Sequence, residues 1–68
     1  MDDIATLKAT IRKLSSRATA AKMNLHDLAE DLPVGWTGIP DVAKAAHDAF
    51  AALEAARQAL AKLENPDG

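Results

Sequence analysis

The sequence predicts an all-α protein: an antiparallel two-helix hairpin, coiled-coil-like, that associates into a four-helix bundle or a higher oligomer. Apolar and small residues recur at steps of three and four on both sides of one central segment, which is the spacing of a helix face. The stretch from Pro33 to Pro40, at this central segment, holds two of the three prolines and two of the three glycines. The chain of 68 residues therefore forms a single helical-hairpin domain over residues 1–68.

The first helix is predicted over about residues 3–32. Asp2 or Asp3 can cap its start by accepting hydrogen bonds from free backbone amides. Pro33 disfavours helix at the preceding residue and has no N–H to donate, so the helix ends near Leu32. Its apolar face consists of Ile4, Leu7, Ile11, Leu14, Ala18, Ala21, Leu25, Leu28 and Leu32.

A bend over residues 33–39 and a second helix over about residues 40–64 follow. Gly35 and Gly38 allow the chain to reverse, Thr37 or Gly38 can cap the helix, and Pro40 suits its first turn. Because the connection is short, the two helices are expected to be antiparallel neighbours. The apolar face of the second helix consists of Ile39, Val42, Ala46, Ala49, Leu53, Ala56, Leu60 and Leu63.

The alanine content of the second helix predicts self-association. Ordering the chain costs about 1.5 kcal/mol per residue, and a two-helix contact rich in alanine buries too little apolar area to offset this. Alanines on several sides of the helix allow close backbone approach, and Phe50 lies beside the apolar face. We therefore expect a homodimer or higher homo-oligomer. Alternatively, alanine is present only because it is the best helix former.

Composition excludes several classes of function. A chain this short has little room for a water-shielded cleft, so we expect no enzyme activity. The absence of cysteine excludes disulfides, thiolate metal sites and thiol chemistry. The sequence has no apolar run of roughly 20 residues, and its start carries acids where a signal peptide carries bases. We therefore expect a cytoplasmic protein that does not enter a membrane.

The candidate metal ligands lie near the end of the first helix. His26 and Glu30 are separated by one helical turn, and Asp27 is next to them. Nitrogen and oxygen donors suit a divalent first-row metal such as iron or nickel. Two ligands alone bind weakly, so a firm site would need donors from another chain or from His47. Alternatively, His26 serves only in a surface ion pair or in helix capping.

The candidate partner-binding residues are Trp36 in the bend and the basic residues Lys8, Arg12 and Lys22. A tryptophan at this position either covers the open end of the helical core or, if exposed, anchors a partner. Between Lys8 and Lys22 the chain has five bases and no acid. A run of this kind usually serves solubility. It could also attract RNA, but no aromatic residue interleaves it, so that attraction would be weak and unselective.

The stretch AKMNLHDLAEDLPVGWTGIPDVA, from Ala21 to Ala43, resembles the signature of small Rop-like proteins encoded within nitrogen-fixation gene clusters, a metalloprotein family associated with nitrogenase. The resemblance extends to the flanking helices. It implies an oligomerising hairpin, a cytoplasmic location in a nitrogen-fixing organism, and a metal role centred on His26 with Asp27 and Glu30 as neighbouring acids. His47 lies outside this stretch.

Two hypotheses follow from the residues and the resemblance together. In the first, the chain is a non-enzymatic accessory protein of nitrogen fixation that binds metal through the His26 region and assists nitrogenase or the assembly of its metallocluster. In the second, it docks on a nitrogenase component, or on a cofactor-assembly protein, through the Trp36 bend and the basic face of the first helix, with no physiological metal.

Overall fold

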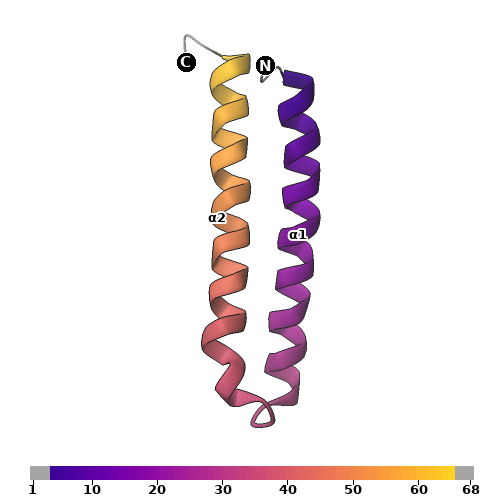
Figure 1. The fold of residues 1–68 in the computed structure, drawn as a ribbon, viewed down its shortest axis with the longest axis vertical. Helices are drawn as coiled ribbons and strands as arrows, with labels where there is room; N and C mark the ends of the chain where they lie inside the picture. The colour runs from indigo at the N-terminus through magenta and orange to yellow at the C-terminus, as the bar shows by residue number, and fades with distance from the viewer. Residues whose placement is uncertain (1–3, 66–68) are drawn as a thin grey trace.

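The computed structural model describes residues 4–65, which form two long antiparallel helices joined by a tight bend (Figure 1). Helix α1 spans Ile4–Asp31 and helix α2 spans Ile39–Glu64. The two helices lie side by side along a rod of 49 × 19 × 17 Å. The predicted all-helical, two-helix hairpin is therefore confirmed. Asp2 and Asp3, the predicted caps of the first helix, lie outside the described residues.

The predicted apolar faces form the contact between the helices. Ala18, Ala46 and Leu53 are buried, and all three belong to those faces. Half-buried members of the same faces continue the contact toward both ends of the rod. Alanines at the centre leave little side-chain volume between the helices, so the hairpin has a thin core. Among residues 4–65, only these three residues are buried.

The bend consists of a turn at 32–35 followed by a 3₁₀ helix, η1, at Trp36–Gly38. The amide of Val34 donates to the carbonyl of Asp31 at 2.9 Å, and the amide of Gly38 donates to the carbonyl of Gly35 at 2.9 Å. Gly35 has a φ of +76°, a left-handed conformation that favours glycine. Gly38 is the N-cap residue of α2 without a side-chain hydrogen bond, and Pro40 lies in the first turn.

Candidate functional site: an exposed histidine beside the bend

His26 lies on the exposed surface of α1, about one turn before the bend. Its side chain is 59% exposed, and Nε2 lies 3.2 Å from Oε1 of Glu30. The two residues face each other because positions four apart are neighbours on a helix. On the other edge of the ring, Nδ1 faces Oδ1 of Asp27 at 3.6 Å. The structure thus brings all three predicted ligands together on one open surface.

The three side chains do not converge on a single point in this structure. Asp27 and Glu30 face opposite nitrogens of the same imidazole, so one ion cannot contact all three groups in this arrangement. Within residues 4–65, no group of three His, Cys, Asp or Glu side chains could hold a metal ion together. Of the two carboxylates, Glu30 is the nearer to the ring, and only its 3.2 Å separation from Nε2 is within hydrogen-bond distance.

The pair formed by His26 and Glu30 has a spacing that suits two ligands of one ion. Donors about 2.1 Å from a metal, at angles between tetrahedral and right-angled, lie roughly 3.0–3.4 Å from each other. The distance of 3.2 Å between Nε2 and Oε1 falls in this range. Any further donors must come from solvent or from another molecule.

His47 on α2 has different surroundings. Its Nδ1 lies 3.3 Å from Oδ1 of Asp48, while Oδ2 of Asp48 accepts a hydrogen bond of 2.7 Å from Nζ of Lys44. The hydrogen bond from Lys44, followed by that from His47, lowers the pKa of the Asp48 carboxyl, and the same bond raises the pKa of Lys44. One turn after His47 the chain has Ala51, which offers no donor. His47 therefore has no second ligand on its own helix.

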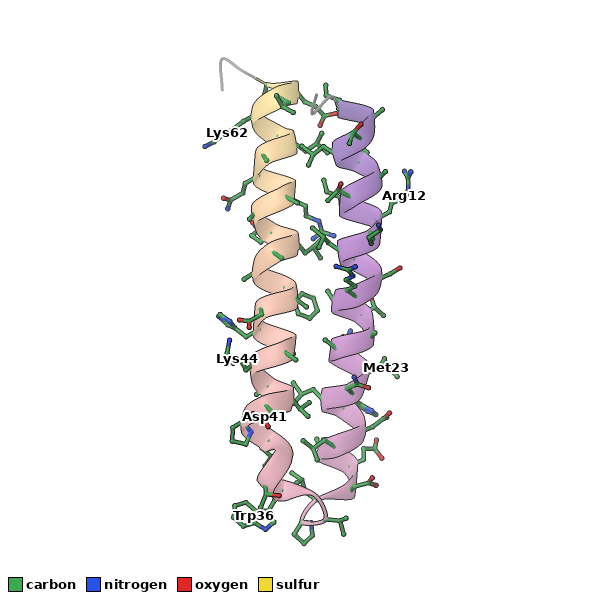
Figure 2. All side chains as sticks on the ribbon, in the orientation of Figure 1. Arg12, Met23, Trp36, Asp41, Lys44 and Lys62 are labelled. Atoms are coloured by element: carbon green, nitrogen blue, oxygen red, sulfur yellow. The ribbon has the colours of Figure 1, made fainter. Side chains whose placement is uncertain are left out.

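Trp36 stands at the tip of the rod and points away from both helices (Figure 2). Its side chain is 63% exposed, and that of Val34 is 74% exposed. Leu32 and Ile39, on either side of the bend, are also exposed. In the hairpin, therefore, Trp36 does not cover the end of the core, which was the alternative to a partner-binding role. The tip instead presents four accessible apolar side chains.

The acidic and basic residues are distributed unevenly along the length of the rod. From residue 23 to residue 43 the chain has four acids and no lysine or arginine, so the bend end is acidic. Toward the other end, Lys8 pairs with Glu64 at 3.8 Å and thereby links the two helices. Arg12 projects outward from α1 (Figure 2), and no acid among the described residues lies within ion-pair distance of Arg12 or Lys22.

Two ion pairs were missed in the sequence analysis. Lys44 and Asp48 are four residues apart on one helix, a spacing that alone indicates a pair. The contact between Lys8 and Glu64 joins two helices, but the hairpin register already places these residues at the same level. Both pairs could therefore have been found from the sequence.

Comparison with known proteins identifies the family. A family model described as Rop-like matches residues 2–65, and the chain belongs to this family. The chain is 55% identical over 64 residues to a UPF0437 protein of Azorhizobium caulinodans, covering 94% of this chain and 93% of the relative. It is 54% identical to the UPF0437 protein y4xE of Sinorhizobium fredii, covering 96% and 97%. No solved structure matches.

A third relative bears on the biological context. The chain is 50% identical over 62 residues to the "UPF0437 protein in nifX-nifW intergenic region" of Frankia alni, covering 91% of this chain and 74% of the relative. That name places the gene of the Frankia alni relative between nifX and nifW. In the described part of the chain, neither long helix is apolar enough to cross a membrane.

Proposed function

We propose that this chain is a non-enzymatic accessory protein of nitrogen fixation that binds a divalent metal ion, iron or nickel, through His26 and Glu30, and assists nitrogenase or the assembly of its metal clusters. The observation that carries the proposal is the approach of Nε2 of His26 to Oε1 of Glu30 at 3.2 Å on an open surface. The name of the Frankia alni relative supports the nitrogen-fixation setting.

The chemistry of the pair suits transfer of a metal better than storage. An imidazole nitrogen and a carboxylate oxygen are good donors for first-row divalent metals. With only two donors from the chain, an ion keeps several coordination positions for water or for ligands of a receiving protein. The exposure of His26 and Glu30, 59% and 67%, leaves those positions accessible. Asp27 lies on the opposite side of the ring, 3.6 Å from Nδ1, where its negative charge would favour a metal-bound imidazole.

Calorimetric titration of the purified protein tests the site. We would titrate Ni²⁺ in air, and Fe²⁺ under anaerobic conditions, into wild type, His26→Ala and Glu30→Gln. We expect His26→Ala to abolish measurable binding and Glu30→Gln to weaken it about tenfold, since an amide is a poorer ligand than a carboxylate. His47→Ala is the matched control, because His47 is also exposed to solvent but has no donor one turn later, and it should leave binding unchanged.

The same variants test the biological role. In a nitrogen-fixing host that carries the gene, His26→Ala should lower nitrogenase activity when iron is limiting, whereas His47→Ala should not. Equal metal affinity of wild type and His26→Ala would remove the site from the proposal. Normal nitrogenase activity with His26→Ala, at normal protein level, would remove its role in nitrogen fixation.

A second candidate function is docking on a nitrogenase component through the bend. It is favoured by the exposure of Trp36 and Val34, 63% and 74%, at a tip surrounded by acids. Exposed tryptophans often dominate the binding energy of an interface, and charges around them steer the encounter. In this case the tip would insert its apolar side chains into a pocket with basic residues at the rim, and metal would play no part.

Affinity capture from nitrogen-fixing cells separates the second candidate from the first. We expect tagged wild type to recover a nitrogenase component and Trp36→Ala to lose most of that recovery. Phe50→Ala is the control, because Phe50 is the other exposed aromatic residue and lies on α2 away from the bend. Unchanged recovery with Trp36→Ala, or equal losses with both variants, would contradict docking through the tip.

A further inference from the structure

Met23 lies on the open surface of α1, three residues before His26. It is 50% exposed and projects from α1 on the side away from α2 (Figure 2). The other large apolar residues of α1 that are exposed, Ile4 and Leu25, belong to the apolar face that packs against α2. Met23 does not belong to that face, so packing between the helices gives no reason for a methionine at this position.

Met23 and His26 are neighbours on this surface, because residues three apart lie on the same side of a helix. Met23 comes one turn before His26, and Glu30 comes one turn after it, with Oε1 at 3.2 Å from Nε2. The imidazole of His26 thus stands between a thioether and a carboxylate. A methionine side chain has three rotatable bonds, which allow its sulfur to approach the ring without any change in the helix.

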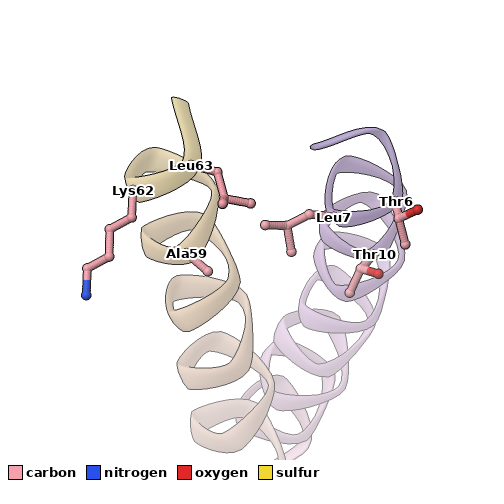
Figure 3. A pocket seen from close by; sticks show the side chains of 6 residues that line it. All are labelled: Thr6, Leu7, Thr10, Ala59, Lys62 and Leu63. Atoms are coloured by element: carbon pink, nitrogen blue, oxygen red, sulfur yellow. The ribbon is translucent and has the colours of Figure 1, made fainter. Parts of the chain in front are cut away.

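An open groove lies between the two helices at the end of the rod opposite the bend (Figure 3). Leu7 and Leu63 point toward each other there, and the groove has a volume of about 530 Å³. It is lined by Thr6, Leu7, Thr10, Ala59, Lys62 and Leu63. None of these is a histidine, a methionine or an acid, so the groove lacks the side chains that usually hold a metal ion. A metal is therefore expected on the open surface around His26 and not in this groove.

We propose that Met23 and His26 together bind Cu(I). A thioether is a soft donor that selects Cu(I), and imidazole suits copper, whereas the carboxylate of Glu30 suits harder divalent ions. Asp27 and Glu30 place two negative charges near the site, against the single positive charge of Lys22, which precedes Met23. The inference rests on the proposed role of His26 as a metal ligand, and it adds to that residue a soft second ligand and a second class of metal.

A competition titration tests the binding of Cu(I). Under anaerobic conditions the protein would compete for Cu(I) with bicinchoninate, a chelator whose copper complex is coloured. Met23→Leu keeps an apolar side chain of high helix propensity but removes the sulfur. We expect Met23→Leu to weaken the binding of Cu(I) at least tenfold and to leave the affinity for Ni²⁺ unchanged. Wild type that binds no Cu(I), an unchanged Cu(I) affinity in Met23→Leu, or an equal loss for both ions would overturn the proposal.

X-ray absorption at the copper edge gives a second readout. Wild type loaded with one Cu(I) per chain should show a sulfur and a nitrogen bound to copper, and Met23→Leu should lose the sulfur. Copper bound only by nitrogen and oxygen in wild type would overturn the proposal, because Met23 is the one sulfur-containing residue between residues 4 and 65.

The second histidine offers a matched gain of binding. Lys44 is three residues before His47, the position that Met23 has relative to His26. Lys44→Met should therefore give each chain a second Cu(I) site, whereas Lys44→Leu, which lacks a sulfur, should not. A second site in both variants, or in neither, would overturn the requirement for a thioether at this spacing.

Failure of this inference can be told apart from failure of the proposed function. If wild type binds Cu(I) through Met23 but binds neither Ni²⁺ nor Fe²⁺, the iron or nickel role falls and the copper site stands. If wild type binds Ni²⁺ through His26 and Met23→Leu has no effect on Cu(I), the copper site falls and the proposed function stands.

Discussion

His26 on α1 and His47 on α2 are both exposed, 59% and 81%, and each is followed directly by an aspartate, yet they are not equivalent. Nε2 of His26 meets Glu30 one turn later, whereas the corresponding residue after His47 is Ala51. The aspartate beside His47 is held by Lys44 at 2.7 Å, whereas Lys22, one turn before His26, makes no ion pair with an acid among residues 4–65.

The difference shows what turns an exposed histidine into a candidate ligand. A neighbouring carboxylate is not sufficient, because a lysine can neutralise it. What matters is a second donor beside a ring nitrogen, as Glu30 is beside Nε2 of His26, together with the absence of a cation paired to the neighbouring carboxylates. Both conditions are local, so they can be removed or installed by substitutions within one or two helical turns.

Gly35→Ala should have the largest effect on stability. It also tests whether the metal affinity of His26 depends only on neighbouring residues of its own helix. Gly35 has a φ of +76°, and an added Cβ would lie 3.2 Å from Cδ1 of Leu28. We expect the free energy of unfolding to fall by about 1–2 kcal/mol, because alanine is strained in this conformation. Denaturation followed by circular dichroism measures this. At temperatures where the hairpin stays folded, the metal affinity of His26 should not change.

Gly38→Ala is the matched control for this prediction. Gly38 has a φ of −84°, and a Cβ there would meet nothing within 4 Å. The stability of Gly38→Ala should therefore stay close to that of wild type. A loss of metal affinity in folded Gly35→Ala would show that the bend, and not only the spacing of His26 and Glu30, shapes the site.

The fold was largely predictable from the sequence because one physical rule dominates it. The three–four spacing of apolar residues selects one face on each helix, and Pro33 and Gly35 leave only a short bend between the faces. The buried residues Ala18, Ala46 and Leu53 all lie on the predicted faces. The 3₁₀ helix at Trp36–Gly38 was not predicted, since a three-residue turn leaves no periodic signal in a sequence.

The site was predictable in its members but not in its geometry. Helical spacing alone places His26 next to Glu30, and the structure agrees. Which nitrogen faces Asp27 depends on the rotamer of the histidine, and spacing does not specify a rotamer. The exposure of Trp36 was undecided for a related reason: whether an indole folds back over a core depends on the bend conformation, which the sequence pattern did not determine.

Giving His47 the same kinds of neighbours as His26 should have the next largest effect. Ala51→Glu supplies a carboxylate one turn after His47, and Lys44→Ala removes the cation that holds Asp48. We expect the double variant to bind a second metal ion per chain, with an affinity within about tenfold of that of the His26 site. Titration calorimetry would report the stoichiometry. In Ala51→Gln/Lys44→Ala, which lacks the carboxylate, the stoichiometry should stay at that of wild type; an equal gain there would mean that the second donor is unimportant.

Lys44→Met should have the smallest effect and isolates the role of the cation. The hydrogen bond from Lys44 is the largest cause that lowers the pKa of Asp48, so this pKa should rise toward its ordinary value, as measured by NMR titration. Because the pKa of Asp48 is lowered in the folded chain, the interaction stabilises above the ordinary pKa and is lost as pH falls through the lowered one. Both side chains are exposed, 75% and 56%, so solvent screens the interaction and the melting temperature should barely change. Lys62→Met, which removes a lysine that has no ion pair among the described residues, should leave the pKa of Asp48 in place. A pKa of Asp48 that does not move in Lys44→Met would show that this lysine does not neutralise the carboxylate, and the contrast between the two histidines would then depend on Glu30 alone.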